Sequence, residues 1–280
     1  MRSGEVLVEG NRIYYEEGGD GIPILFLEGL GYSTWMWFRQ VEGLSSRYRC
    51  ILVDNRGVGK SSRLSAPYTV EQFARDAVSV LEALNVDGAF LVGVSMGGFI
   101  AQSIASIYGS RVRGIVLIST SCGGKYSLPM PKETWDELVK TQQGEDERSR
   151  IERVMKLAFT DSFPKNRSEE FDRIIDMRIK SPQDRQQWLF QAMSSAGFDA
   201  HESDMRMQQP ALIIAGMKDR VLPWQNSLYL YKAIPNSSLV LFSGQNHLLF
   251  IEEYQKVNSL IDSFIEETLN GTFVSKVEVI

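Results

Sequence analysis

A serine between two glycines gives the clearest sign of chemistry in this chain. Ser95 lies in the segment GVSMG at residues 93–97, between an apolar run at residues 89–94 and a stretch with helical spacing. A G-x-S-x-G motif at a strand-to-helix turn exposes the serine hydroxyl, and its glycines permit the close backbone approach of so tight a turn. In a chain with 23 glycines the motif also arises by chance. Its position between a strand and a helix therefore carries the prediction that Ser95 is a nucleophile.

A serine hydroxyl needs a neighbouring base, and the chain has only 2 histidines. His247 follows an apolar run at the place where parallel sheets form their active sites, so we predict that it deprotonates Ser95. His201 lies among acidic residues and is expected on the solvated surface. Asp219 is the only carboxylate in its loop and is the predicted orienting acid, with Asp204 as the competing candidate.

Short apolar runs predict the strands that position these side chains. Apolar and polar residues alternate at 6–8 and 12–17, which favours an opening antiparallel pair. The later runs are bounded by glycine or polar residues and are continuously apolar, as is typical of strands buried on both faces. They lie at residues 24–27, 50–53, 89–94, 115–118, 211–215 and 238–242. Helical spacing at residues 70–84 and 99–108 predicts helices that cover a mostly parallel sheet.

A charged stretch interrupts this alternation between residues 121 and 209. It contains no convincing strand, and its apolar residues recur at helical spacing at 151–158 and 171–179. We expect residues 121–209 to form a helical lid inserted into a core made of residues 1–120 and 210–270. Methionines concentrated in this segment are candidates to roof a pocket beneath it. Residues 271–280 are expected to form a C-terminal tail.

Composition narrows the class of protein. The chain has 280 residues, of which 43% are hydrophobic and 23% are charged, as is typical of a globular protein with a large core. Its net charge of -5 argues against a nucleic-acid partner, and no apolar run is long enough to make the membrane a partner. Without a secretory signal pattern, a cytoplasmic location is expected. Cys50 and Cys122 are too few for a disulfide framework or a metal site and are expected to be reduced.

Two further segments extend the pattern around Ser95. Residues 28–31 read EGLG, at the place of an H-G-x-G loop, and residues 54–61 read DNRGVGKS, similar to a D-x-R-G-x-G-x-S loop. With these loops and the order Ser95, Asp219, His247, the sequence resembles the α/β-hydrolase superfamily over nearly its whole length. The resemblance is to its compact esterase, 3-oxoadipate enol-lactonase-like and haloperoxidase-like branch. It implies an α/β fold with a mostly parallel eight-stranded sheet, helices on both faces and an inserted helical lid.

The resemblance also implies a reaction without a metal or an organic cofactor. Ser95 would attack an ester-like carbonyl, and water would then release the acyl group, while the backbone N–H groups of Leu30 and Met96 hold the oxyanion. Glu28 departs from the pattern, because many relatives carry histidine there. An ionised carboxylate would oppose the developing negative charge, so we expect Glu28 to turn away and pair with Arg56, or else to stay protonated.

The predicted function is hydrolysis of a small carboxylic ester or lactone by water. Candidate pocket residues are Trp35, Cys122, Trp135, Trp188 and Leu248. Two alternatives stay open, namely a slowly reacting protein that senses a ligand or binds a partner, and an acyltransferase. A dehalogenase or an epoxide hydrolase is disfavoured, because both use aspartate where this chain has Ser95.

Overall fold

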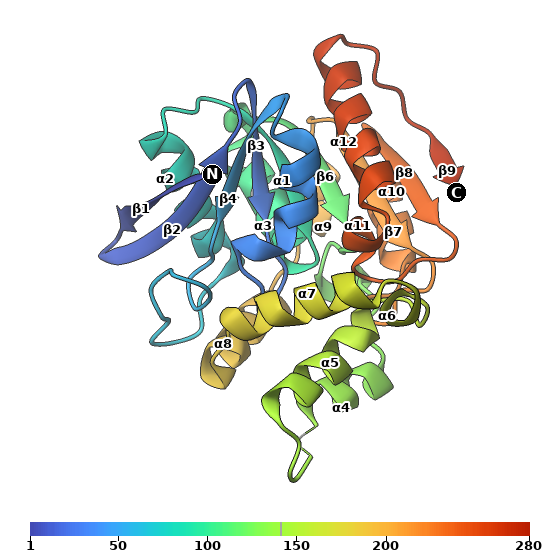
Figure 1. The fold of residues 1–280 in the computed structure, drawn as a ribbon. Coiled ribbons are helices and arrows are strands. Elements are labelled where there is room, and N and C mark those ends of the chain that lie inside the picture. The colour runs from blue at the N-terminus through green and yellow to red at the C-terminus, as the bar shows by residue number, and fades with distance from the viewer. Residues whose placement is uncertain (141) are drawn as a thin grey trace.

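A nine-stranded sheet runs through the molecule, with helices on both faces (Figure 1). The computed structural model describes residues 1–140 and 142–280. The strands are β1 (Arg2–Val8), β2 (Asn11–Gly18), β3 (Ile22–Leu27), β4 (Tyr48–Val53), β5 (Ala89–Val94), β6 (Val112–Ile118), β7 (Ala211–Gly216), β8 (Ser237–Phe242) and β9 (Val277–Val279). Their spatial order is β1-β2-β4-β3-β5-β6-β7-β8-β9. β2 pairs antiparallel with β1 and β4, whereas the remaining neighbours pair in parallel, which confirms the expected α/β class.

Helices alternate with the parallel strands as the sequence predicts. They are α1 (Phe38–Leu44), α2 (Val70–Ala83), α3 (Met96–Ile107), α4 (Lys132–Val139), α5 (Glu147–Ala158), α6 (Phe163–Asn166), α7 (Ser168–Lys180), α8 (Arg185–Ala196), α9 (His201–Asp204), α10 (Gln225–Ala233), α11 (Leu249–Glu252) and α12 (Tyr254–Leu269). Helix α2 begins with a capping box, in which Thr69 and Gln72 each accept a hydrogen bond from the other's backbone N–H. α4 to α9 follow one another between β6 and β7.

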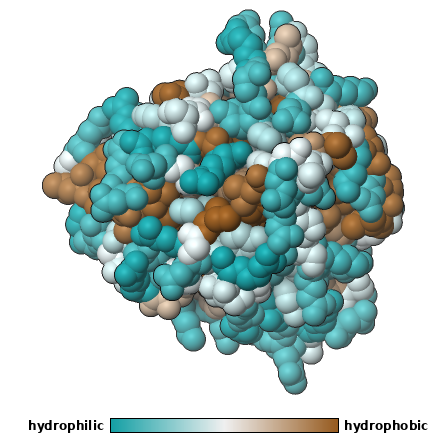
Figure 2. Space-filling model, turned by 90° about the horizontal axis from the view of Figure 1, so that it is seen from above, coloured by the Kyte–Doolittle hydropathy of each residue, from teal (hydrophilic) through white to brown (hydrophobic). Residues whose placement is uncertain are grey.

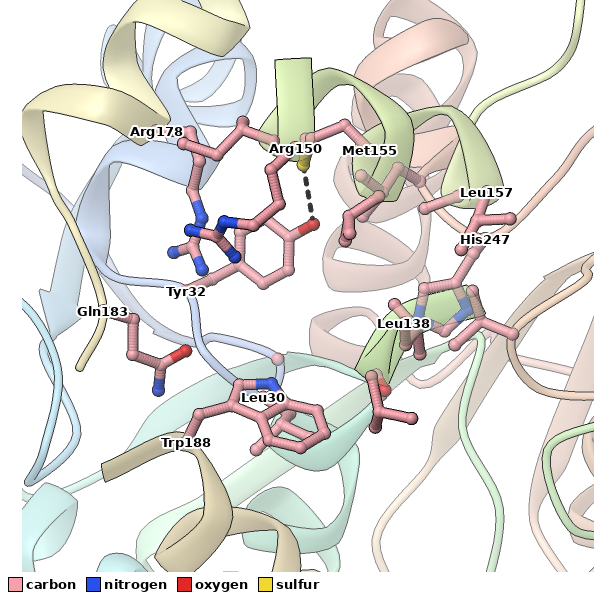
Figure 3. Close-up of a pocket in the computed structure, with 18 of the residues that line it drawn as sticks. Leu30, Tyr32, Leu138, Arg150, Met155, Leu157, Arg178, Gln183, Trp188 and His247 are labelled. Carbon is pink, nitrogen blue, oxygen red and sulfur yellow. Dashed lines mark hydrogen bonds between the residues drawn. The ribbon is translucent and has the colours of Figure 1, made fainter. Parts of the chain in front are cut away.

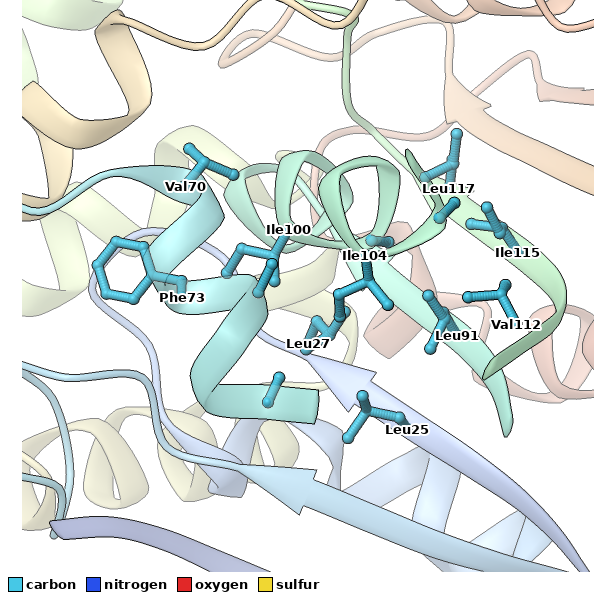
Figure 4. Close-up of a cluster of buried hydrophobic side chains, with 14 of the residues drawn as sticks. Leu25, Leu27, Val70, Phe73, Leu91, Ile100, Ile104, Val112, Ile115 and Leu117 are labelled. Atoms are coloured by element: carbon cyan, nitrogen blue, oxygen red, sulfur yellow. The ribbon is translucent and has the colours of Figure 1, made fainter. Parts of the chain in front are cut away.

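Strand side chains alternate between two hydrophobic cores. On β3, Leu25 and Leu27 face a core shared with α2, α3 and α10, while Ile24 and Phe26 face a core shared with α1 and α12. All four side chains are fully buried, which explains why the strand reads as a continuous apolar run. Figure 4 shows the first core, with Leu25, Leu27, Leu91, Ile115 and Leu117 from the strands and Val70, Ile100 and Ile104 from helices α2 and α3.

The segment between β6 and β7, which we call the insertion (residues 121–209), is helical where the structure describes it. Its helices α4, α5, α7 and α8 lie together beside one edge of the sheet (Figure 1). Helices α5 and α7 bury the apolar faces that the sequence predicts, through Ile151, Met155, Phe171 and Ile174. On the outside, Arg148 of α5 forms ion pairs with two aspartates of α7. The insertion thus has a core of its own that continues into the core beside α1 and α12.

The C-terminal tail contains β9, so the sheet has one strand more than the eight expected. β9 pairs in parallel with β8, with Val277 beside Leu239 and Val279 beside Leu241. Both valines are exposed. The strand is therefore held by backbone hydrogen bonds rather than by burial, and its sequence carries little of the hydrophobic signal that marks the other strands.

The described residues contain no candidate membrane span, no candidate metal site and no disulfide. Among the described residues, no helix is long and apolar enough to span a bilayer, and no three His, Cys, Asp or Glu side chains are grouped to hold a metal ion. Seen from above, the surface is mostly hydrophilic with smaller hydrophobic areas between (Figure 2). Cys50 and Cys122 are buried free thiols, and burial raises the pKa of each to about 12, so neither is a reactive thiolate near neutral pH.

Candidate active site

Ser95 occupies a strained turn between β5 and α3. Its φ is 52°, a left-handed value that a residue with a side chain rarely adopts. The neighbouring glycines make this turn possible, since a Cβ on Gly93 would lie 2.3 Å from the carbonyl oxygen of Gly97. A Cβ on Gly97 would lie 1.9 Å from the carbonyl oxygen of Leu27. The turn is therefore a close approach of three backbone segments, and it presents Ser95 at the end of a central strand.

Asp219 and His247 meet beside the same edge of the sheet. Asp219 follows β7 and His247 follows β8, and the imidazole Nδ1 lies 2.8 Å from Asp219 Oδ2. The Asp219 side chain is fully buried, and its other oxygen accepts the backbone N–H groups of Val221 and Leu222, each at 2.8 Å. With Nδ1 held by the carboxylate, Nε2 of a neutral imidazole is the nitrogen free to accept a proton.

Asn246 fixes the loop that carries His247, although no sequence pattern singles it out. Its Oδ1 accepts the backbone N–H groups of His247 at 2.8 Å and of Arg220 at 3.0 Å. Its Nδ2 donates to the carbonyl oxygens of Leu157 and Phe159 at the end of α5. This buried amide therefore ties the Asp219 loop, the His247 loop and the insertion together.

A cavity of about 470 Å³ separates the insertion from the sheet edge (Figure 3). Ser95 and His247 both line it, together with Leu30 from the loop after β3. Trp135, Trp188 and Leu248, which the sequence suggested as pocket residues, also line this cavity. Much of the remaining lining is apolar and comes from the insertion, including Met130, Leu138, Val154, Met155 and Leu157.

Two suggested pocket residues lie elsewhere. Trp35 does not line the cavity but packs against Tyr32, with ring centroids 5.6 Å apart, in the core beside α1. Cys122 is buried in the core on the other side of the sheet. Both expectations were wrong because an apolar side chain near a strand end fills a core as readily as a pocket, and sequence alone does not separate the two.

The loop after β3 is braced by the insertion. The Gly31 N–H donates to Gln191 Oε1 at 3.1 Å, and the Gly31 carbonyl accepts a hydrogen bond from Arg178. Leu30 therefore sits in a loop whose position depends on α7 and α8. Met96 is the first residue of α3, so its N–H has no acceptor one turn earlier in the helix. The N–H groups of Leu30 and Met96 make no hydrogen bond within the part of the chain that the structure describes.

Glu28 turns away from the cavity, but Arg56 does not neutralise it. Glu28 Oε1 accepts the backbone N–H of Asn55 at 2.6 Å, and Oε2 has no partner among the described residues. Arg56 instead forms a buried ion pair with Asp76, with Nε 2.6 Å from Oδ2 and Nη2 2.5 Å from Oδ1. Complete burial, reinforced by the nearby Asp54, raises the pKa of Glu28 well above its usual range. The protonated alternative therefore fits the structure, and the expected pair with Arg56 does not.

The competing histidine and aspartate lie apart from this cavity. His201 is half-buried rather than solvated, with Nδ1 2.5 Å from the Tyr229 hydroxyl and its ring tilted against that of Tyr126. Asp204 is fully buried, and neither of its carboxyl oxygens has a hydrogen-bond partner among the described residues. Burial, with a smaller effect from Asp199, raises the pKa of Asp204 to about 8. Asp219, and not Asp204, is the carboxylate bound to His247.

Comparison with known proteins identifies the family. The family model for the alpha/beta hydrolase fold matches residues 22–254. The chain belongs to the α/β-hydrolase family. It is 30% identical over 272 residues to AB hydrolase superfamily protein YisY of Bacillus subtilis, a match that covers 90% of this chain and 94% of that protein. It is 25% identical over 252 residues to 3-oxoadipate enol-lactonase 2 of Acinetobacter baylyi, covering 88% of this chain and 90% of that protein.

Solved structures of this α/β-hydrolase family show the same architecture. The enol-lactonase from Burkholderia xenovorans LB400 superposes with a TM-score of 0.82 at 23% identity. The match covers 94% of this chain and 100% of that one. The sequence resemblance to α/β hydrolases is thereby confirmed, and the chain is a member of a family of hydrolases.

Proposed function

We propose that this α/β hydrolase is a serine hydrolase that cleaves a small carboxylic ester or lactone. One observation carries the proposal. Ser95, held at a φ of 52°, shares a cavity with His247, whose other ring nitrogen is bound by the buried Asp219. Nucleophile, base and orienting acid come from the ends of three parallel strands, which is the arrangement that activates a serine hydroxyl near neutral pH.

The proposed reaction has two halves. In the first, His247 Nε2 takes the proton of Ser95 Oγ while the oxygen attacks the substrate carbonyl, and His247 returns that proton to the leaving alkoxide as the C–O bond breaks. An acyl-enzyme remains on Ser95. In the second, His247 deprotonates a water that attacks the ester carbonyl, and the acid leaves as Ser95 regains its proton. Asp219 keeps the imidazole in the required tautomer and stabilises its positive charge.

The oxyanion of each tetrahedral intermediate is assigned to the backbone N–H groups of Leu30 and Met96. Both are free of other acceptors in the described chain, and Met96 begins helix α3, whose N-terminal dipole favours negative charge. A donor of this kind contributes on the order of 10² to 10³ in turnover. With Glu28 protonated and facing Asn55, no carboxylate opposes the developing charge.

The substrate class follows from the cavity and from the relatives. A lining rich in Leu, Val, Met and Trp side chains suits an apolar acyl or alcohol portion, and about 470 Å³ suits a small molecule. Enol-lactonases and an esterase from Exiguobacterium antarcticum are among the proteins and structures similar to this chain. Both kinds of substrate present a carboxylic ester bond to the nucleophile.

The test is hydrolysis of p-nitrophenyl acetate and p-nitrophenyl butyrate by the wild type, Ser95→Ala and Ser103→Ala. We expect Ser95→Ala to lose about 10³-fold or more of kcat. Ser103 is a buried serine of α3 without a hydrogen-bond partner among the described residues, and its variant should keep the wild-type rate. Activity retained by Ser95→Ala would refute the assigned nucleophile.

The same experiment separates the remaining alternatives. No turnover above background by the wild type would favour a ligand-binding protein that carries an unused triad. If the wild type releases nitrophenol but transfers the acyl group to an added alcohol more readily than to water, the protein is an acyltransferase. Mass spectrometry of the products distinguishes the free acid from the transferred ester.

A further inference from the structure

Two arginines of the insertion point into the Ser95 cavity without a carboxylate partner. Arg150 of α5 and Arg178 of α7 both line the cavity, and Figure 3 shows their guanidinium groups beside each other and next to the ring of Tyr32, across the cavity from His247. Among the described residues neither makes an ion pair. Arg150 is exposed and Arg178 is half-buried. Two like charges side by side repel each other, so an anion between or beside them would be bound favourably.

Arg178 is held in place from the protein side. It donates a hydrogen bond to the carbonyl oxygen of Gly31, and its guanidinium carbon lies 5.2 Å from the centroid of the Tyr32 ring. Burial, followed by the nearby Arg150, lowers the pKa of Arg178, while Tyr32 acts in the other direction. A guanidinium has five N–H donors. The bond to Gly31 therefore leaves most of the donors of Arg178 free for a ligand.

Other arginines of the same helices show that these two are unusual. Arg148 of α5 bonds to Glu152, Asp172 and Asp176, and Arg153 of α5 bonds to Glu137 and Glu145. Acidic partners are therefore abundant around α5, yet none of the described carboxylates forms an ion pair with Arg150. Glu147 is the only carboxylate in the described lining of the cavity, where Lys140 and Arg185 add to the positive charge. The cavity is thus locally cationic in a chain whose net charge is -5.

Gln183 adds an uncharged group to the same end of the cavity. Its Oε1 is buried and has no hydrogen-bond partner among the described residues, while its Nε2 bonds weakly to Gln191 at 3.3 Å. Tyr32 also lines the cavity, and its hydroxyl donates to the thioether of Met155 at 3.1 Å. This part of the cavity therefore holds polar groups without hydrogen-bond partners among the described residues, whereas Leu138, Val154 and Leu157 contribute apolar lining.

We propose that Arg150 and Arg178 form a subsite for a carboxylate carried by the substrate, so that the preferred substrate is an ester or lactone with a second, anionic end. This inference rests on the proposed hydrolytic function, because the ester bond must reach Ser95 while the carboxylate reaches the arginines. A planar carboxylate matches the forked donors of a guanidinium. Charge-assisted hydrogen bonds of this kind are stronger than hydrogen bonds between neutral groups. The apolar lining between the two ends suits a short hydrocarbon chain.

The test uses two esters that differ only at the far end. Monomethyl adipate ends in a carboxylate and methyl hexanoate in a methyl group, and acid release from both is followed in a pH-stat, with monomethyl glutarate and methyl pentanoate as the shorter pair. In at least one pair, the wild type should have a kcat/KM about tenfold or more higher for the anionic ester. Arg150→Gln should lower this anionic-to-neutral ratio by about 10-fold to 100-fold. Arg178→Lys, which keeps the charge but changes the donor geometry, should lower it as well.

The matched control is Arg148→Gln. It removes the same charge from the same helix and breaks the ion pairs between α5 and α7, but Arg148 does not line the cavity. Its ratio should equal that of the wild type. The proposal is overturned if the wild type prefers the neutral ester in both pairs, or if Arg150→Gln and Arg148→Gln give the same ratio.

Binding separates this proposal from the hydrolytic function itself. Calorimetry with Ser95→Ala protein should show monomethyl adipate binding at least tenfold more tightly than methyl hexanoate, and the Ser95→Ala/Arg150→Gln protein should lose that difference. Arginine-dependent binding without turnover would uphold the subsite and refute the hydrolase. Turnover of both esters without an arginine-dependent preference would uphold the hydrolase and refute the subsite.

Discussion

Glu28 has the most unusual environment of the residues around the strained serine. It immediately precedes the loop assigned to the oxyanion, is fully buried, and accepts a hydrogen bond only from the Asn55 backbone at 2.6 Å. Desolvation is the main cause that raises its pKa and Asp54 adds to it, and together they outweigh the backbone N–H groups of Asn55 and of Glu28 itself, which act in the other direction. The neutral acid is therefore the form that the fold stabilises, and its role is to hold the loop after β3 against the loop after β4.

Replacement by glutamine tests this assignment. Glu28→Gln keeps an oxygen that can accept the Asn55 N–H and removes the ionisable group, so kcat for p-nitrophenyl butyrate at pH 7 should stay within about threefold of the wild type. Glu28→Leu removes the acceptor and leaves a buried N–H unsatisfied, which should lower the free energy of unfolding in urea by about 1–3 kcal/mol. A tenfold or larger loss of kcat in Glu28→Gln would show that a charged carboxylate is needed at this position.

At the residue scale, the sequence is informative where a short motif specifies a turn. The position of Ser95 and its neighbouring glycines could be predicted because the turn needs them within five residues, and His247 because the chain has only 2 histidines. Arg150 and Arg178 could not be singled out, since nothing local distinguishes them from the paired Arg148 and Arg153. Whether an arginine has a carboxylate partner is decided by contacts between distant helices, and that same dependence made Asp76 rather than Glu28 the partner of Arg56.

At the scale of elements, helix α8 links the insertion to two loops of the sheet edge. Gln191 accepts the Gly31 N–H at 3.1 Å and donates to the Arg56 carbonyl at 2.8 Å. One turn earlier, Gln187 accepts the Leu64 N–H at 2.6 Å and donates to the Leu64 carbonyl at 3.0 Å. Both amides are buried and each makes a pair of bonds to core backbone, but only Gln191 reaches the loop that carries Leu30. The insertion therefore supports the geometry of that loop as well as covering the cavity.

These two glutamines form a matched pair for experiment. Gln191→Met and Gln187→Met should lose similar stability, about 1–3 kcal/mol each, because each leaves buried backbone groups unsatisfied. Only Gln191→Met should lower kcat, by about tenfold, since a shifted Leu30 N–H weakens oxyanion binding, while KM changes less. Kinetics with p-nitrophenyl butyrate and urea unfolding provide both readouts. Equal kcat values in the two variants would mean that Gln191 only stabilises the fold.

Elements could be predicted from the sequence when burial shaped their composition. The central strands are apolar because both faces are covered, and α2, α5 and α7 show the helical spacing of a half-buried surface. β9 could not be predicted, because its three residues are exposed and, in the described part of the chain, β8 is the strand with which it pairs. The insertion was expected to roof a pocket, but the side chains by which it lines the cavity were hidden, since helical spacing reveals a buried face but not the surface that covers it.

At the scale of the whole molecule, buried carboxyl groups make stability depend on pH. Burial is the main cause that raises the pKa of Asp76 to about 6 and of Asp204 to about 8, and that of Glu28 is raised as well. In each case the carboxyl keeps its proton up to a higher pH in the folded chain than in the unfolded chain. The contribution of such a group is fully present below its unfolded pKa and is lost as pH rises through the folded pKa. As the pH rises from about 4 to about 8, these three carboxyls therefore make the free energy of unfolding fall.

Asp204 should dominate this dependence, because its carboxyl oxygens lack any partner among the described residues and its pKa of about 8 is far from its ordinary value of 3.8. The free energy of unfolding of Asp204→Asn, measured in urea relative to the wild type, should rise by roughly 2–3 kcal/mol between pH 5 and pH 7.5, up to about 1.4 kcal/mol per pH unit. Comparing two pH values cancels the constant difference between an amide and an acid. Glu202→Gln, an exposed change in the same helix, should show no such trend. If the two variants follow the same pH profile, Asp204 ionises normally in the folded chain, and any pH dependence of this sign comes from other buried carboxyls such as Glu28 and Asp76.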